Sequence, residues 1–129
     1  MKKKFLVVGN PIDHSMSPKL HNYWIKKYKI DAIYEKKLLK NNDIEDLIFN
    51  IREEKIHGIN VTVPYKKIII PFLDELSEEA KTSQSVNTIY KKDNKVIGNN
   101  TDIEGFKLSL EETGYEIKNK KALILGAGG

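Results

Sequence analysis

A short strand that ends beside a lysine is the segment of this sequence best suited to chemistry. Residues 59–63 are rich in β-branched side chains, and Pro64, which cannot donate to a sheet ladder, should end the strand. Successive side chains of a strand point to opposite faces, so Asn60 and Thr62 share a face, and Lys66 follows at the carboxyl end. Open α/β sheets bind ligands at that end, which predicts a polar binding site. The alternative is an edge strand with one solvent-exposed face and a solvated lysine that has no binding role.

Two serines form a second candidate site, in the loop before the first expected helix. Ser17 is followed by Pro18, a pattern typical of a helix start, and Ser15 lies just before it. Hydroxyls and free backbone amides at a helix N-terminus suit a carboxylate or a phosphate. The structural alternative is an N-cap at Ser17 and a turn at Ser15. His14 could carry a proton near neutral pH, although a lone loop histidine is more often a surface residue.

Asp102 is the candidate partner of the lysine. It follows Thr101 at the start of another expected helix, whose positive end should keep the carboxylate ionised. Polar residues cluster just before it, and Asn87 lies in a similar polar segment. If Lys66 and Asp102 meet in one cleft, they could exchange a proton with a substrate hydroxyl. Acids at this helix position are also common for structural reasons alone.

The composition is that of an ordinary globular domain and argues against several classes of function. The 129 residues are 40% hydrophobic and 31% charged. With no cysteine, the sequence has no disulfide framework or thiolate metal site, the histidines share no metal-ligand spacing, and a cytoplasmic, metal-free protein is expected. No apolar run approaches the roughly 20 residues that span a bilayer. The net charge is +4, but Arg52 is the single arginine and the lysines are dispersed, which disfavours nucleic acid and suits a small anionic substrate.

Hydrophobic periodicity and turn residues predict an α/β fold with a largely parallel sheet. The expected elements are strands 4–9, 32–38 and 59–63, helices beginning at 17, 44 and 77, a hairpin of 86–90 with 95–98, a helix from 101 to Gly114, and a strand 121–125. Capping boxes are expected at 42–45 and 101–104. Apolar stripes should face the core in three helices: Ile44, Leu47, Ile48 and Ile51; Leu20, Tyr23, Trp24 and Tyr28; and Ile103, Phe106 and Leu110.

A glycine-rich turn follows the last expected strand. It consists of Gly126, Ala127, Gly128 and Gly129. Such a turn normally precedes a helix whose N-terminus holds a pyrophosphate, so these residues are candidates for cofactor binding. Taken alone they are weak evidence, because any strand can end in glycines.

Together, these segments resemble the shikimate dehydrogenase family. The resemblance is carried by motifs in the family's order: Gly-Asn-Pro-Ile-Asp-His-Ser-Met-Ser-Pro at 9–18 with His21 and Asn22, Gly-Ile-Asn-Val-Thr-Val-Pro-Tyr-Lys at 58–66, Val-Asn-Thr at 86–88, Gly-Asn-Asn-Thr-Asp at 98–102 with Gly105 and Phe106, and Gly-Ala-Gly-Gly at 126–129. No single motif is specific, whereas their combination along almost the whole chain is.

The resemblance implies a substrate-binding domain of an NADP-dependent oxidoreductase. Such an enzyme reduces 3-dehydroshikimate to shikimate in the chorismate pathway of aromatic amino acid biosynthesis. In the family, the serines that match Ser15 and Ser17 hold the substrate carboxylate. The positions whose counterparts bind the ring hydroxyls are Asn60, Thr62, Lys66, Asn87 and Asp102. The counterparts of Lys66 and Asp102 form the catalytic pair, and the lysine is the usual candidate for proton transfer.

The resemblance also implies a division of the chain. Residues 1–101 should form a three-layer αβα substrate-binding domain with a mostly parallel sheet plus a hairpin, and 102–118 a linking helix. Residues 119–129 should supply the first strand and glycine turn of a Rossmann domain whose remainder is missing. This chain alone is therefore expected to bind shikimate weakly, without turnover. The expected partners are a small-molecule substrate and a second copy in a homodimer, with no nucleic acid or membrane.

Some positions depart from the family pattern and leave alternatives open. Tyr65 stands where histidine is frequent, and Thr-Ser-Gln-Ser at 82–85 replaces an Ile-Gly-Ala run, which should alter the helix packing beside Asn87. A quinate or dual quinate/shikimate dehydrogenase is the near alternative, although the paired serines favour shikimate. A non-catalytic shikimate-binding module is the alternative from another class.

Overall fold

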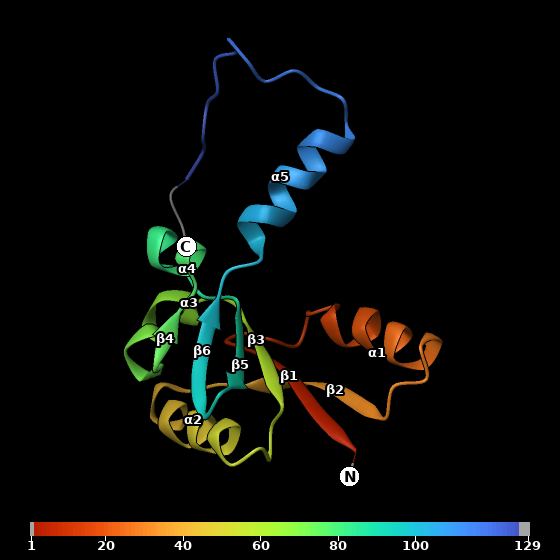
Figure 1. The fold of residues 1–129 in the computed structure, drawn as a ribbon, viewed down its shortest axis with the longest axis vertical. Coiled ribbons are helices and arrows are strands. Elements are labelled where there is room, and N and C mark those ends of the chain that lie inside the picture. Colours follow the sequence, from red (N-terminus) through yellow and green to blue (C-terminus); the bar gives the residue numbers. More distant parts are fainter. Residues whose placement is uncertain (1, 127–129) are drawn as a thin grey trace.

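A six-stranded sheet organises the chain, as Figure 1 shows for a computed structural model that describes residues 2–126. The strands are β1 (Lys3–Gly9), β2 (Ala32–Leu38), β3 (Gly58–Val61), β4 (Glu75–Leu76), β5 (Thr88–Lys92) and β6 (Lys95–Asn99). The α-helices are α1 (Ser17–Lys27), α2 (Ile44–Arg52), α3 (Tyr65–Ile68), α4 (Glu78–Ser83) and α5 (Asp102–Glu112), with short 3₁₀ turns at Asn41–Asp43 and Ile70–Phe72. The predicted α/β class is confirmed. None of the helices in this part of the chain is long and apolar enough to cross a membrane.

The strand order is β2-β1-β3-β5-β6-β4. Parallel pairs join β1 to β2, β1 to β3 and β4 to β6, whereas β5 runs antiparallel to both of its neighbours. The predicted hairpin is β5–β6, and its two-residue turn places Asp93 and Asn94 at positive φ, which these residue types tolerate. The short edge strand β4 was missed by the sequence analysis, because two residues carry no readable alternation.

The main core lies between α2 and one face of the sheet. The four apolar residues predicted to face inward from α2 are all buried: Ile44, Leu47, Ile48 and Ile51. They pack with the alternate side chains of β1, Leu6 and Val8, as the strand period requires. The capping box predicted at 42–45 is wrong. The Asp43 carboxylate instead accepts the backbone N–H of Lys40, because a 3₁₀ turn precedes the helix.

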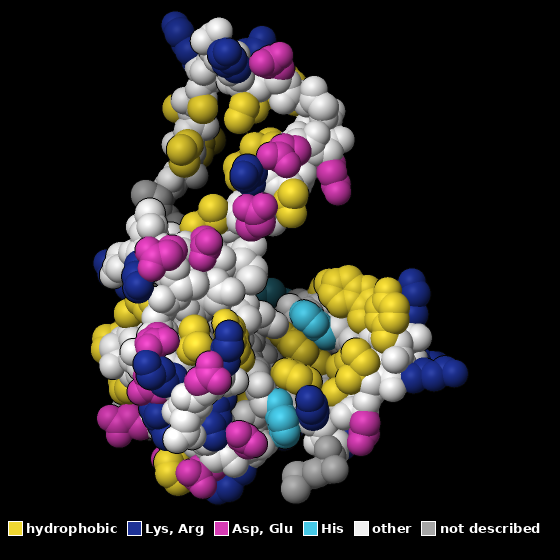
Figure 2. Space-filling view, in the orientation of Figure 1, with side chains coloured by type: hydrophobic (Ala, Val, Ile, Leu, Met, Phe, Trp, Pro, Cys, Tyr) yellow, Lys and Arg dark blue, Asp and Glu magenta, His cyan; other side chains and the backbone are white. Residues whose placement is uncertain are grey.

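The opposite face of β1 and β2 is covered by α1, but not through the predicted stripe. Leu20, Tyr23, Trp24 and Tyr28 are all exposed, and Figure 2 shows hydrophobic side chains on the outer surface of this helix. The helix approaches the sheet through Ile25, which packs on Val7 and Tyr34, and through the neighbouring polar residues His21 and Asn22. Periodicity predicted the wrong face because the side of α1 that contacts the sheet is only half-buried and contains polar groups.

Helix α5 extends away from the sheet (Figure 1). The prediction that Ile103, Phe106 and Leu110 point inward is wrong for this chain, since no residue of α5 is buried. Gly114 has a φ of +67° just after the helix, which confirms the predicted stop. The helix is left exposed because nothing among the described residues packs against its apolar side.

Residues 121–126 form no strand, contrary to the expectation for 121–125. The side chains of Leu123, Ile124 and Leu125 are each more than 80% exposed, at 86%, 83% and 89%. A strand needs a neighbouring strand to bond its N–H and C=O groups, and this segment has none within the described part of the chain. The predicted glycine turn, apart from Gly126, lies outside the described residues.

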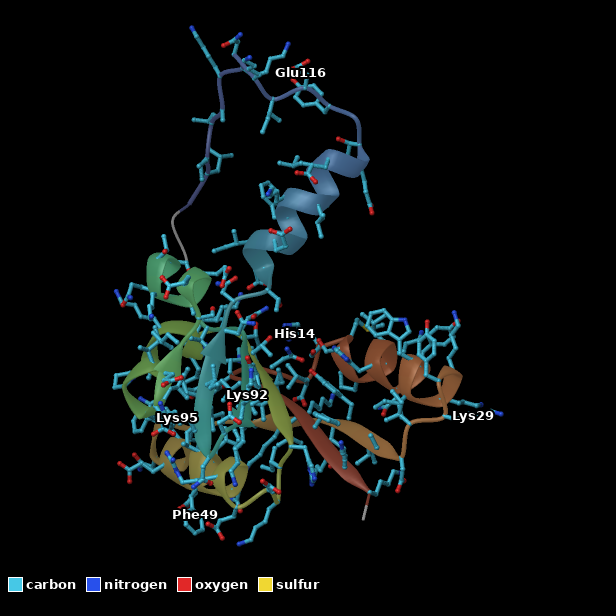
Figure 3. The ribbon with its side chains drawn as sticks, viewed as in Figure 1. His14, Lys29, Phe49, Lys92, Lys95 and Glu116 are labelled. Carbon is cyan, nitrogen blue, oxygen red and sulfur yellow. The ribbon has the colours of Figure 1, made fainter. Side chains whose placement is uncertain are left out.

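Replacing Leu47 with alanine should destabilise the domain. Leu47 is fully buried, so the cavity left in the core should lower the free energy of unfolding by about 2–5 kcal/mol in chemical denaturation. The matched control is Phe49→Ala in the same helix, since Phe49 is 53% exposed and points away from the sheet (Figure 3). The control should cost less than about 1 kcal/mol. Equal losses for the two variants would contradict this assignment of the buried face.

Candidate active site

Polar side chains from five segments meet at the carboxyl edge of β1 and β3. They line a cavity of about 230 Å³. Its lining residues are Val7, Ser17, His21, Asn60, Val61, Thr62, Lys66, Asn87 and Asp102. Six of the seven residues predicted to bind or transform a ligand are therefore brought together by the fold. The seventh, Ser15, lies in the adjoining loop and accepts the backbone N–H of Ser17 at 3.3 Å.

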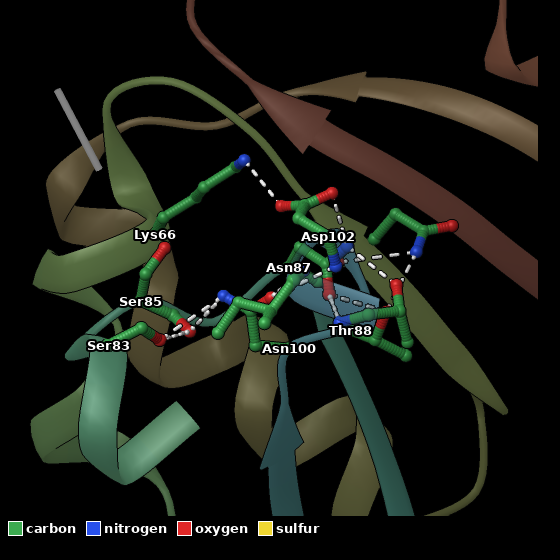
Figure 4. Close-up of polar contacts among 10 residues, drawn as sticks. Lys66, Ser83, Ser85, Asn87, Thr88, Asn100 and Asp102 are labelled. Atoms are coloured by element: carbon green, nitrogen blue, oxygen red, sulfur yellow. Dashed lines mark hydrogen bonds and ion pairs between the residues drawn. The ribbon is translucent and has the colours of Figure 1, made fainter. Parts of the chain in front are cut away.

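Lys66 and Asp102 form an ion pair at the centre of this site (Figure 4). The distance from Lys66 Nζ to Asp102 Oδ2 is 2.8 Å, and the two side chains are 22% and 52% exposed. Helix α3 carries Lys66, and the neighbouring Tyr65 anchors that helix by donating its hydroxyl to the Leu39 carbonyl at 2.7 Å. A lysine–carboxylate pair that is partly exposed to the cavity can bind a hydroxyl group and move a proton to or from it.

The amide of Asn87 holds Asp102 in place. Its Nδ2 donates to Asp102 Oδ1 at 3.0 Å and to Thr101 Oγ1 at 2.8 Å. Its Oδ1 accepts from the Thr101 backbone N–H at 2.9 Å and from the Thr88 hydroxyl at 3.0 Å. Because one carboxylate oxygen bonds Asn87 and the other bonds Lys66, the orientation of the Asp102 carboxylate is determined on both sides.

Asn100 caps the helix on which Asp102 lies, so the capping box predicted at 101–104 is wrong. The Asn100 Oδ1 accepts the backbone N–H groups of Asp102 at 2.9 Å and Ile103 at 3.2 Å, whereas Thr101 makes no cap bond. The buried Asn100 amide also donates to the Ser85 carbonyl at 2.9 Å and to Ser83 Oγ at 3.3 Å. The serines of 82–85, which depart from the family pattern, thus contribute to this cap (Figure 4).

Asn60 and Thr62 form the wall on β3 and the loop after it. Asn60 Nδ2 donates to the Asn87 carbonyl and to Thr88 Oγ1, both at 3.2 Å. Thr62 donates its backbone N–H to the Val8 carbonyl at 2.9 Å, which draws it close to the end of β1. Gly9 permits this approach, because a Cβ there would lie 2.5 Å from Thr62 Cγ2.

The serine loop is held by backbone and lysine contacts. Ser15 donates its N–H to the Ile12 carbonyl at 3.0 Å, and Lys36 Nζ donates to the Asp13 carbonyl at 2.7 Å. Ser17 is the first residue of α1 and not its N-cap, a position occupied by Met16 without a side-chain bond. The Ser17 hydroxyl is therefore not used to cap the helix, which leaves it available to the cavity.

Two further residues contribute to the site, His21 and Tyr34, of which Tyr34 escaped the sequence analysis. Their rings stack at a centroid distance of 4.2 Å and an angle of 4°. Burial lowers the pKa of His21, so its ring is neutral at pH 7. Burial also raises the pKa of Tyr34, an effect that the Ser17 hydroxyl opposes, and the phenol stays protonated. No sequence signal singled out Tyr34, because it looks like an ordinary strand aromatic.

A larger cavity of about 420 Å³ lies beside this site, along the α1 face of the sheet. It shares His21 and Asn60 with the polar site but is lined mainly by apolar residues such as Ile25, Ile59 and Ile89. It contains neither Lys66 nor Asp102, so the smaller polar cavity is the one suited to chemistry. No group of three or more potential metal ligands occurs within residues 2–126.

The fold and the site define an open α/β domain with a polar cavity at the carboxyl edge of its strands, the place where such sheets bind ligands. A family model described as "Shikimate dehydrogenase substrate binding domain" matches residues 7–89. The chain belongs to this family, and the resemblance inferred from the motifs is confirmed.

Similar proteins carry consistent names. The chain is 80% identical over 129 residues to a shikimate dehydrogenase (NADP(+)) of Pelagibacter ubique, covering all of this chain and 49% of that protein. Identity to the Bacillus subtilis shikimate dehydrogenase (NADP(+)) is 44%, over 100% of this chain and 46% of that protein. The chain thus spans about half the length of these relatives.

Solved structures agree with the predicted fold. The crystal structure of shikimate dehydrogenase 1 from Peptoclostridium difficile has a TM-score of 0.89 at 36% identity, over 98% of this chain and 48% of that one. A shikimate 5-dehydrogenase from Listeria monocytogenes in complex with shikimate and NAD has a TM-score of 0.90 at 34% identity, over 99% of this chain and 44% of that one. The predicted fold class is confirmed by these neighbours.

Replacing Asn100 with alanine should loosen the start of α5. The change removes the cap from two backbone N–H groups and one of the two donors to the Ser85 carbonyl, so stability should fall by about 1–3 kcal/mol. Hydrogen exchange at the Asp102 and Ile103 amides should become faster. The matched control is Thr101→Ala, at the residue that sequence favoured as the cap, and it should change this exchange less. Faster exchange in the control than in Asn100→Ala would contradict the observed cap.

Proposed function

We propose that this chain is the shikimate-binding domain of an NADP-dependent shikimate dehydrogenase, which reduces 3-dehydroshikimate to shikimate. The observation that carries the proposal is the Lys66–Asp102 pair at 2.8 Å, set in a cleft lined by amide and hydroxyl side chains. A ring that carries a carboxylate and several hydroxyl groups matches such a cleft. Membership of the family supports the same ligand.

Each polar group of the cavity has a proposed role. Ser15 and Ser17, at the N-terminus of α1, are positioned to hold the ligand carboxylate, since the helix end favours negative charge. Asn60 and Thr62 face the ring hydroxyls, and Asn87 lines the cavity beside them while its amide orients Asp102. The ammonium group of Lys66 has hydrogens beyond the one directed to Asp102, so it can hydrogen-bond the ring carbonyl and protonate its oxygen as the alcohol forms. Asp102 orients Lys66 through their ion pair.

NADP(H) supplies the hydride when it is bound. Of the glycine turn predicted to hold it, Gly126 has a φ of +98° and an open surrounding that a Cβ would not crowd, which fits a backbone that approaches a phosphate. Ala127, Gly128 and Gly129 lie outside the described residues. One similar structure is a shikimate dehydrogenase in complex with NADP+, which supports this choice of cofactor.

Several finer predictions accompany the proposal. They are a cytoplasmic location, a homodimer, no partner among nucleic acids or membranes, and domain limits at 1–101, 102–118 and 119–129. The dispersed lysines and the single arginine support a small anionic ligand over nucleic acid. Both serines of the loop are present, which favours shikimate over quinate as the ligand.

Binding of shikimate to this chain tests the proposed ligand. Titration followed by NMR should give saturable shifts at Ser15, Ser17 and Asn60, because the carboxylate and hydroxyl groups bind there. The methyl ester of shikimate is the matched control, and it should bind more weakly because it lacks the charge that the α1 N-terminus favours. Shifts absent from the cleft, or equal affinity for acid and ester, would contradict the proposal.

The catalytic role of Lys66 is tested in an active enzyme. A chimera in which this chain replaces the matching segment of the Pelagibacter ubique relative should be functional, given the 80% identity. In it, Lys66→Ala should lower kcat by about 10²–10⁴-fold with little change in KM, as expected when proton transfer is lost. Lys67→Ala, at an exposed neighbour outside the cavity, should leave both constants unchanged. If the loss at Lys66 is confined to KM, Lys66 is a binding residue.

A further inference from the structure

Tyr34 lies behind the polar cavity and touches both of its walls. The residue is on β2, and its side chain is buried, with a relative exposure of 4%. Its hydroxyl donates to Asn60 Oδ1 at 2.6 Å, a short distance for this type of bond. Tyr34 itself is not among the residues that line the polar cavity.

The direction of this hydrogen bond follows from the other side of the Asn60 amide. Asn60 Nδ2 faces the backbone carbonyl of Asn87 at 3.2 Å, and a carbonyl can only accept a hydrogen bond. The NH₂ group of Asn60 must therefore face Asn87, and the amide oxygen must face Tyr34. The second hydrogen of this NH₂ group is used on Thr88 Oγ1, so Asn60 has a lone pair on Oδ1 left for a ligand. The Asn60 side chain can therefore accept a hydrogen bond from a ligand, but it has no hydrogen left to donate.

Tyr34 is also joined to α1, the helix that begins at the serine loop. Its ring stacks on His21, which lies on this helix. The Asn22 amide bonds both backbone groups of Tyr34, with Nδ2 to the carbonyl at 2.7 Å and Oδ1 to the N–H at 3.0 Å. Tyr34 therefore links α1 to Asn60 on β3.

We infer that Tyr34 is a positioning residue, which holds the Asn60 side chain and presents Asn60 Oδ1 as an acceptor for a ligand hydroxyl. The identity of the ligand rests on the proposed function, whereas the bridge itself is a property of the unliganded chain. Tyr34 thus acts on ligand specificity through Asn60, although Tyr34 does not line the cavity.

The test removes only the hydroxyl. Tyr34→Phe keeps the ring on His21 and the backbone bonds to Asn22, so the variant should fold. In the unliganded chain, the Asn60 side-chain amide signals should shift in ¹⁵N NMR spectra. Shikimate affinity should weaken by about two- to tenfold, as expected for the loss of one or two hydrogen bonds. The matched control is Tyr90→Phe, since Tyr90 is half-buried on β5 and its hydroxyl bonds no described residue.

A double-mutant cycle separates positioning from general stability. In an Asn60→Ala background, Tyr34→Phe should change shikimate affinity by less than about twofold, because its effect passes through Asn60. The same factor in both backgrounds would overturn the inference, as would unchanged Asn60 signals in Tyr34→Phe. If the parent chain does not bind shikimate while those signals shift as expected, the proposed function fails and the bridge is upheld.

Discussion

The hydrogen bonding of the Asn87 amide is the constraint on which the rest of the site depends. Both amide hydrogens and both lone pairs of its oxygen are used within the protein, on Thr88, Thr101 and Asp102. The Asn87 carbonyl adds bonds from the Val61 backbone and the Asn60 side chain. A fully satisfied polar network of this kind is rigid, because moving any member would leave a polar group without a partner. It joins the strand β3, the hairpin and the first turn of α5 into one wall.

This rigidity explains how an open cleft can hold a charged pair in a defined geometry. An exposed lysine–carboxylate pair contributes little stability by itself. Here Asn100 caps the backbone of Asp102 and Asn87 orients its carboxylate. The Asp102 side chain is therefore already ordered, and forming the ion pair costs less conformational entropy. Within the described residues, no buried side-chain nitrogen or oxygen lacks a hydrogen-bond partner. The polar groups of the cleft are thus compatible with a stable fold, and the pair can be used for chemistry.

Much of the fold could be predicted, and the errors have a common cause. The limits of β2 and the buried face of α2 follow from hydrophobic periodicity, because these elements bury apolar side chains against the sheet. The buried face of α1 was mispredicted because polar His21 and Asn22 contact the sheet, which periodicity cannot detect. The inward face of α5 and the strand at 121–125 depend on packing partners that these residues lack here. Local patterns describe what a segment can bury, and neighbours decide whether it does.

The sequence by itself determined the α/β class, the family and seven polar residues of the site, of which six line the cavity and Ser15 adjoins it. Its motifs specify residue types at strand and helix ends, which parallel pairing necessarily collects at one edge. Only the tertiary structure decided how these groups are oriented: that Lys66 faces Asp102, that Asn100 and not Thr101 caps α5, and that Tyr34 stacks on His21 and bonds Asn60. The physical reason is that a hydrogen bond is defined by distance and direction between groups far apart in the chain, and neither is encoded in local spacing.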